Sequence, residues 1–106
     1  MALKDIQFDV HRWVSQFKIE YFKPLEIFTA IGEEFGELGR ELNNRYGPRT
    51  KKSPQDTADI GDEIGDIIFN LVCLANSHNI DLDEVWQKKM DKQHGRDSNR
   101  FERKEI

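Results

Sequence analysis

Four acidic residues in two matched pairs are the most informative feature of the sequence. The pairs are Glu34-x-x-Glu37 and Glu63-x-x-Asp66. Residues three apart on a helix share a face, so each pair directs two carboxylates toward one spot. Like charges at this spacing repel unless a cation lies among them. Such oxygen ligands suit Mg²⁺, with Mn²⁺ as a substitute, and predict a metal-dependent enzyme acting on a phosphate compound.

A basic series, Lys89, Lys92 and Arg96, follows at helical spacing near the end of the chain. Two interpretations stay open. Cations near a helix C-terminus are favourable with the helix dipole, and they can also receive the phosphates of a bound nucleotide. The three histidines have no ligand spacing to one another or to Cys73, so a zinc site is not predicted.

Hydrophobic periodicity predicts the helices that would position these groups. The expected helices cover roughly residues 3–19, 24–42, 53–75 and 81–93. Pro24 fits a first helical turn, Ser53-Pro54 offers an N-cap and a first-turn proline, and Asp81-x-x-Glu84 resembles a capping box. No strand alternation or internal repeat is present, so we expect an all-α protein of four main helices.

The third of these helices is apolar around most of its circumference, which is typical of a helix buried on most sides. Asp59, Glu63, Asp66 and Asn70 nevertheless form one narrow stripe on it. Acidic residues are rarely buried unless paired or bound to metal. The alternative is a stripe that faces solvent beside a basic neighbour. One E-x-x-E pair is a weak signal, whereas acidic pairs at one level of two antiparallel helices are much more specific.

Five glycines lie within the second and third predicted helices. Each costs roughly 1 kcal/mol relative to alanine in a helix, so they need a compensating contact. We expect close approach of the helix backbones, and the alternative is that some mark kinks or frayed turns. These glycines are Gly32, Gly36, Gly39, Gly61 and Gly65.

The composition indicates a small protein that associates with itself. The chain has 106 residues, of which 37% are hydrophobic and 34% are charged. This hydrophobic content is low for a monomer of this length, so we expect a homodimer or homotetramer.

A net charge of −4 argues against nucleic-acid binding. Neither a signal peptide nor a membrane span is predicted, and we expect a cytoplasmic protein. Cys73 is expected to be buried and reduced. We expect one domain over residues 1–96 and a polar, poorly ordered tail over 97–106.

These motifs resemble the EExxE…ExxD signature of the MazG-like nucleoside triphosphate pyrophosphohydrolases, most of all the small stand-alone, YpjD-type members. The resemblance covers roughly residues 6–97 and extends beyond the acids. The segments that carry it are FTAIGEEFGELGRELN, DEIGDIIFNLVCLANSHNIDLDEV and KKMDKQHGRD. It implies an all-α helical bundle completed by oligomerisation, with active sites at or near subunit interfaces. It also implies Mg²⁺-dependent hydrolysis of (d)NTPs to monophosphate and pyrophosphate.

The resemblance also implies roles for individual residues. The metal ligands would be Glu34, Glu37, Glu63 and Asp66. Substrate would contact Asn70, and its phosphates would meet Lys89, Lys92 and Arg96. Glu33 matches the first acid of the signature with no role assigned, and the stretch from Trp13 to Phe22 matches an aromatic surface for the base.

The expected mechanism is attack of a metal-activated water on the α-phosphate, with Glu34 orienting or deprotonating that water. Two alternatives stay open: a phosphoribosyl-ATP pyrophosphohydrolase of the same superfamily, and a non-catalytic helical module that binds nucleotide or metal. A di-iron bundle is not predicted, because the chain contains no Glu-x-x-His motif. The preferred base and sugar stay open.

Overall fold

Four helices in sequence order make up the part of the chain that the computed structural model describes, residues 1–48, 56–96 and 98–104. They are α1 (Leu3–Val14), α2 (Pro24–Tyr46), α3 (Asp56–Ser77) and α4 (Leu82–His94). No strand occurs among the described residues, so the prediction of an all-α protein with four main helices is confirmed.

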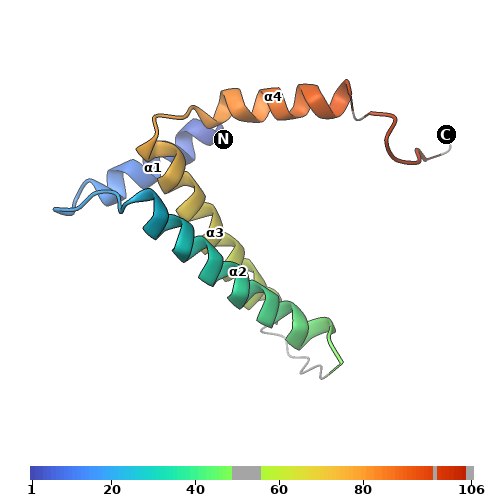
Figure 1. The fold of residues 1–106 in the computed structure, drawn as a ribbon, viewed down its shortest axis with the longest axis horizontal. Coiled ribbons are helices and arrows are strands. Elements are labelled where there is room, and N and C mark those ends of the chain that lie inside the picture. The colour runs from blue at the N-terminus through green and yellow to red at the C-terminus, as the bar shows by residue number, and fades with distance from the viewer. Residues whose placement is uncertain (49–55, 97, 105–106) are drawn as a thin grey trace.

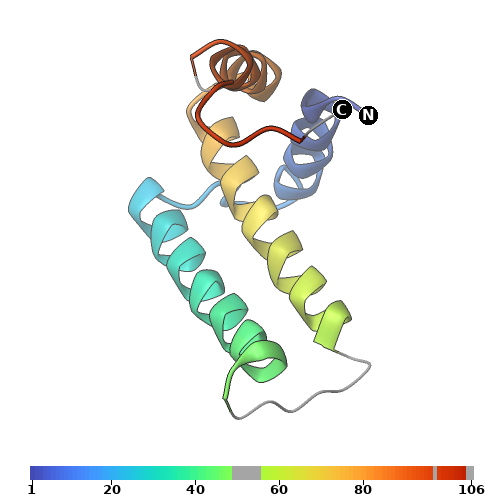
Figure 2. The ribbon, with the colours of Figure 1, turned by 90° about the vertical axis from the view of Figure 1, so that its right-hand side faces the viewer.

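Helices α2 and α3 form an antiparallel pair that lies side by side along most of its length (Figure 1 and Figure 2). Helix α1 packs against the C-terminal half of α3, near the start of α2. Helix α4 follows the end of α3, packs against α1, and projects away from the α2–α3 pair (Figure 1). The helix pair is therefore covered mainly at one end.

The core lies where α1 meets this end of the helix pair. Burial of each aliphatic side chain there contributes about 1.5–3 kcal/mol. Its buried members are Val10 and Val14 of α1, Ile27 and Ile31 of α2, and Val72 and Cys73 of α3. Burial also raises the pKa of the Cys73 thiol, so Cys73 behaves as a small apolar residue, as the sequence predicted.

Much apolar surface outside this core stays exposed in the single chain. Ile64 and Ile68 of α3 are 44% and 46% exposed, so the prediction that this helix is buried on most sides is wrong for one chain alone. The reason is that α1 and α2 provide its main contacts among the described helices, and they leave its other side uncovered. Although α3 is apolar, no helix among the described residues is long and apolar enough to cross a membrane.

Helix α1 ends at Val14, five residues before the predicted end at residue 19. The Ser15 hydroxyl donates to the carbonyl of His11 (2.6 Å), which offers the backbone an alternative to continued helix. The amide of Phe17 then bonds three residues back, to Val14 (3.1 Å), in a tighter turn. The segment from Ser15 to Lys23 is therefore a connection and not a further helical turn.

The other helix ends agree with the sequence signals where the structure describes them. Helix α2 ends at Tyr46, where the N–H of Gly47 closes the last turn on Asn43 (2.8 Å). Asp81 caps α4 by accepting from the N–H groups of Asp83 and Glu84. The predicted cap at Ser53-Pro54 lies outside the described residues.

The helix glycines do not bring α2 and α3 together, so the close helix contact that they predict is not made within the single chain. A Cβ added at any of the five would meet no atom of the chain within 4 Å. The two helices pack through other faces, and the glycine faces look outward. These residues are Gly32, Gly36, Gly39, Gly61 and Gly65.

Candidate functional site

Three carboxylates meet between α2 and α3. Glu34 and Glu37 lie one turn apart on α2, and Glu63 faces them from α3. One oxygen from each lies within 4.8 Å of the others. The antiparallel pairing explains this meeting, because it brings the middle of α2 level with the first half of α3 (Figure 2).

Two of these carboxylates are poorly compensated by the rest of the chain. Oε2 of Glu34 and Oε2 of Glu63 are buried and have no hydrogen-bond partner. Among the described residues no lysine or arginine forms an ion pair with these three carboxylates, so a basic neighbour does not compensate Glu63, the one member of the α3 stripe in the cluster. Buried carboxylate oxygens are costly unless paired or bound to a cation. An all-oxygen donor set of this kind fits Mg²⁺.

The proximity of the carboxylates changes the protonation of the cluster when no metal is bound. A hydrogen bond shared with the Glu34 carboxyl, burial and the Glu37 carboxyl raise the pKa of Glu63 to about 7. The closeness of the two carboxyl groups favours a proton on one of them, because like charges at this distance repel. Part of the metal-free protein therefore carries a proton in the cluster at neutral pH, and a cation would displace it.

Asp66, the fourth predicted ligand, lies one turn after Glu63 on α3, and its side chain is exposed. Its carboxylate is not one of the three that meet within 4.8 Å. Glu33, the first acid of the signature, is also exposed and outside the group. The structure therefore brings together three of the four predicted ligands, and Asp66 stays a prediction.

An apolar cleft of about 550 Å³ opens between the segment after α1 and the helix pair. The predicted aromatic stretch lines one side of it, and α2 and α3 supply the rest. From the aromatic stretch come Trp13, Phe17, Tyr21 and Phe22, with Ile27 from α2 and Phe69, Asn70 and Cys73 from α3. The amide of Asn70 donates to the backbone carbonyl of Asp66 (3.0 Å), which fixes this side chain along α3.

The cleft and the acidic cluster lie on the same helix pair at a defined spacing. Ile27 precedes Glu34 by seven residues on α2, and Asn70 follows Glu63 by seven residues on α3. Seven residues are two helical turns, or about 10 Å. Because the helices are antiparallel, both offsets point the same way, and Asp66 lies between the two features.

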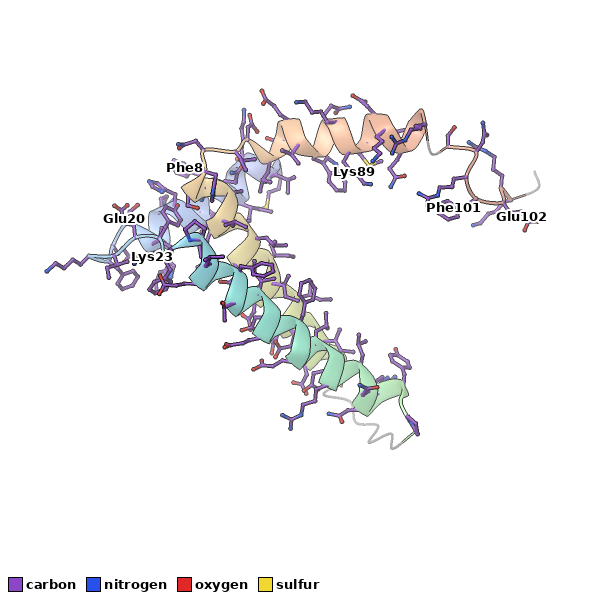
Figure 3. The ribbon with its side chains drawn as sticks, in the orientation of Figure 1. Phe8, Glu20, Lys23, Lys89, Phe101 and Glu102 are labelled. Carbon is purple, nitrogen blue, oxygen red and sulfur yellow. The ribbon has the colours of Figure 1, made fainter. Side chains whose placement is uncertain are left out.

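Lys89 and Lys92 lie on α4, Arg96 follows two residues after its end at His94, and all three are exposed. Helix α4 packs against α1 and not against the α2–α3 pair at the level of the acidic cluster. Figure 3 shows Lys89 on the projecting helix, away from α2 and α3. The structure does not bring this series to the acidic cluster of the same chain.

Sequence reasoning did not assign some residues that shape the cleft. Ile27, Phe69 and Cys73 line it, yet their apolar periodicity predicts only burial in a core. Their positions in the sequence could have indicated them: Phe69 directly precedes Asn70, and Ile27 follows the end of the predicted aromatic stretch by five residues.

These features define the class of protein: an all-α chain whose antiparallel helix pair carries a carboxylate cluster able to hold a divalent cation. A family model for the MazG nucleotide pyrophosphohydrolase domain matches residues 22–101. The chain belongs to this family, as the motifs predicted.

Known relatives support the same conclusion at the level of sequence and fold. The Bacillus subtilis (strain 168) protein YpjD is 48% identical over 104 residues, which cover 98% of this chain and 94% of YpjD. The crystal structure of B. subtilis YpjD matches with a TM-score of 0.79 over 87% of this chain and 94% of that one. A Bacillus-conserved MazG protein, described as a nucleotide pyrophosphohydrolase, matches with a TM-score of 0.75 at 39% identity, over 87% and 88%.

Proposed function

We propose that this protein hydrolyses nucleoside triphosphates to the monophosphate and pyrophosphate with Mg²⁺ as cofactor. The observation that carries the proposal is the pair of unpartnered buried oxygens, one on Glu34 and one on Glu63, within a three-carboxylate cluster. Membership of the MazG nucleotide pyrophosphohydrolase family supports the substrate class.

The cluster is the proposed cation site. Glu34, Glu37 and Glu63 would hold the ion, and Asp66 would join them from the next turn of α3. When bound, Mg²⁺ neutralises phosphate oxygens and lowers the pKa of a water molecule. Among the described residues no basic side chain forms an ion pair with these carboxylates, so the cation and its phosphate ligand would complete the charge balance.

Hydrolysis then needs a water oxygen to attack the α-phosphorus in line with the departing pyrophosphate. The new bond joins that oxygen to phosphorus, and the bond from the α-phosphorus to the bridging oxygen breaks. Glu34 is the proposed base, because it is half-buried in the cluster and can accept the proton of the attacking water. Pyrophosphate leaves with the electron pair of the broken bond.

The aromatic cleft is the proposed binding site for the nucleotide base. Its walls offer flat apolar rings such as Trp13 and Phe17, on which a base can stack, and Asn70 adds a polar edge. The spacing of about 10 Å between cleft and cluster suits a nucleoside whose α-phosphate reaches the carboxylates. Base, sugar and metal would then lie along one groove of the α2–α3 pair.

The basic residues on α4 and just after its end are proposed to receive the β- and γ-phosphates. Lys89, Lys92 and Arg96 would offset the charge that grows on the departing pyrophosphate. Because α4 projects from its own helix pair, α4 of a second copy is the proposed source of these cations. A homo-oligomer therefore forms part of the proposed active species.

The exposed surface of the chain supports self-association. A protein of 12.5 kDa is expected to expose roughly 6,200 Å². The chain exposes 8944 Å². The surplus over the expected area is comparable to the area that obligate interfaces bury. Its radius of gyration is 17.5 Å, against about 13 Å for a compact chain of this length. The outward glycine face beside Phe28 and Phe35 would admit a second helix pair closely.

The decisive experiment measures pyrophosphate and monophosphate release from canonical and modified (d)NTPs, with Mg²⁺ and with EDTA. EDTA-sensitive release of both products supports the proposal, and the ranking of substrates identifies base and sugar preference. Turnover of phosphoribosyl-ATP above every triphosphate would reassign the substrate within the superfamily. Mg²⁺-dependent nucleotide binding without release, by folded protein, would identify a non-catalytic binding module.

A further inference from the structure

The first turns of α1 and α4 cap each other. The carboxylate of Asp83 on α4 accepts from the backbone N–H of Leu3 (2.9 Å) and, at longer range, of Lys4 (3.4 Å). In return the side-chain oxygen of Gln7 on α1 accepts from the N–H of Leu82, the first residue of α4 (3.0 Å). The first N–H groups of a helix have no intrahelical partner. Each helix thus satisfies donors of the other.

Gln7 also connects α4 to the end of α3. Its Nε2 donates to the carbonyl of Ile80 (2.8 Å), in the connection between the two helices, and to Oδ1 of Asn76 on α3 (2.8 Å). Asn76 donates from Nδ2 to the backbone carbonyl of Gln7 (3.0 Å). The amide of Gln7 therefore uses both hydrogens and its oxygen, which holds the side chain in one geometry.

Asn76 extends this network to the aromatic cleft. Its Nδ2 also donates to the hydroxyl of Tyr21 (3.1 Å), and that hydroxyl lies 2.8 Å from Nδ1 of His11. Burial raises the pKa of Tyr21, so the hydroxyl keeps its proton at neutral pH and can donate it to His11. The ring of Tyr21 lines the cleft. One pair of amides thus fixes a cleft wall and the start of α4 together.

Helix α4 depends on this attachment more than the other helices do. None of its residues is buried, and it packs against α1 rather than along the helix pair. Leu82, at its first position, is its contact with the core. From Leu82 to Lys89 the helix rises about 10 Å, so a tilt of roughly 20° at the first turn moves Lys89 by about 3–4 Å. Small changes at Gln7 are therefore amplified at the basic residues.

We propose that Gln7 and Asn76 are positioning residues for nucleotide binding. Without touching substrate, they hold the wall of the cleft at Tyr21 and the direction of α4 in one rigid unit. The inference rests on the proposed function, because it takes the cleft as the base site and α4 as the phosphate-binding helix. Its consequence is that loss of the Gln7 amide weakens both parts of the site, whereas loss of the Tyr21 hydroxyl affects the cleft alone.

Three variants test this division of roles. Gln7→Leu removes the amide at similar volume, and Tyr21→Phe removes the hydroxyl that links Asn76 to the cleft. Gln87→Leu is the matched control, because its amide donates locally within α4, to Oδ1 of Asp91 (2.9 Å), and takes no part in the attachment of α4. Gln7→Glu is a second variant at the same position. It keeps an acceptor for the N–H of Leu82 and loses both hydrogen bonds donated by Nε2, and it replaces Gln7→Leu in the test if that variant does not fold.

The first measurement follows the direction of α4 without any substrate. Nitroxide labels at cysteines introduced at Glu33 on α2 and Lys88 on α4, both exposed, report the distance between the helices in a Cys73→Ala background. Labelled chains are diluted with unlabelled chains so that the distance is measured within one chain. Gln7→Leu is expected to broaden the distance distribution, and Tyr21→Phe and Gln87→Leu to leave it unchanged.

The second measurement follows nucleotide binding. For the triphosphate that the wild type turns over best, Gln7→Leu is expected to raise KM about five- to tenfold and also to lower kcat, because a displaced α4 loses contact with the bound phosphates and with the departing pyrophosphate. Tyr21→Phe is expected to weaken the binding of deoxynucleoside monophosphates about threefold, as measured by the quenching of Trp13 fluorescence in a Trp86→Phe background. A merely structural role of Gln7 would lower stability without raising KM and without changing the label distances.

The outcomes separate this inference from the proposed function. An unchanged distance distribution in Gln7→Leu or Gln7→Glu, or a rise in KM no larger than that in Gln87→Leu, overturns the positioning role. Absence of turnover by the wild type rejects the proposed function alone, because the label distances and the monophosphate titration still decide the positioning role.

Discussion

Glu34 on α2 and Glu63 on α3 face each other with one buried oxygen apiece, Oε2, that has no hydrogen-bond partner. Their carboxylates meet a third, from Glu37, within 4.8 Å. A helix pair that places three like charges together opposes its own folding unless protons or a cation compensate them. The stability of this protein should therefore respond to metal and to pH through the same group.

Metal binding is expected to stabilise the folded protein. Free Mg²⁺ at about 100 times its Kd adds about 2.7 kcal/mol to the free energy of unfolding. Thermal unfolding with EDTA and with increasing Mg²⁺ measures this effect. Glu63→Gln is expected to abolish it and to raise the Tm of the metal-free protein, since one of the like charges is gone. Asp62→Asn, at the exposed neighbouring position, should behave as the wild type, and a metal response retained in Glu63→Gln would reject this cation site.

The stability of the metal-free protein is expected to fall as pH rises. The pKa of Glu63 is raised from 4.5 to about 7 in the folded state, so the folded chain binds its proton more tightly than the unfolded chain does. The stabilising contribution is complete below pH 4.5 and is lost as the pH rises through 7. Urea unfolding in EDTA at pH 5 and pH 8 measures the difference.

The Glu63→Gln variant provides the control for this pH dependence, because its slope between pH 5 and pH 8 should flatten. A hydrogen bond from Lys4 lowers the pKa of Asp81, and that contribution changes only as pH falls below 3.8, outside the window. A wild-type protein that gains stability from pH 5 to pH 8 in EDTA would contradict the assignment.

Activity is expected to require the ligands on both helices. Glu37→Gln and Asp66→Asn should each reduce pyrophosphate release at least about 100-fold, because loss of a carboxylate impairs metal binding more than loss of an outer partner does. Far-UV circular dichroism should show that both variants stay folded. Asp62→Asn is again the matched control. Full activity of Asp66→Asn would restrict the metal site to the three carboxylates that meet in the structure.

The local features of the sequence were sufficient to predict much of this molecule. The hydrophobic periodicity and the helix-capping residues predicted four helices, and Asp81 caps α4 as expected. The acidic pairs predicted one site because both lie on helices long enough to pair in register. A signal confined to one or two turns, such as a cap or a carboxylate pair, depends little on the rest of the fold.

Features that depend on tertiary packing were not predictable in the same way. Phe35 and Ile64 have the periodicity of core residues, yet they are exposed because none of the four described helices covers them. Gly36 indicated a close helix contact, and open space lies beside it. Periodicity identifies an apolar face but not the element, or the chain, that packs on it.

The exposed apolar face of α2 and α3 is expected to hold copies of the chain together. Phe35→Asp places a charge on this face and should shift the protein from an oligomer toward a monomer, as measured by light scattering after size-exclusion chromatography. Phe8→Asp, at an exposed aromatic residue on α1, is the control and should keep the wild-type mass. A wild-type protein that is monomeric at micromolar concentration would contradict both the interface and the supply of basic residues by a second copy.

The aromatic cleft is expected to contribute binding energy for the base and none for the phosphates. Phe17 lines the cleft and is 51% exposed, so Phe17→Ala removes a stacking surface without opening the core. Stacking of one base on an aromatic ring contributes about 1–3 kcal/mol, so KM should rise roughly 5- to 150-fold while kcat changes little. Steady-state kinetics with the best triphosphate measure the effect, and Phe8→Ala is the control outside the cleft. If Phe17→Ala instead lowers kcat and leaves KM unchanged, the ring acts at the reacting phosphate and the base binds elsewhere.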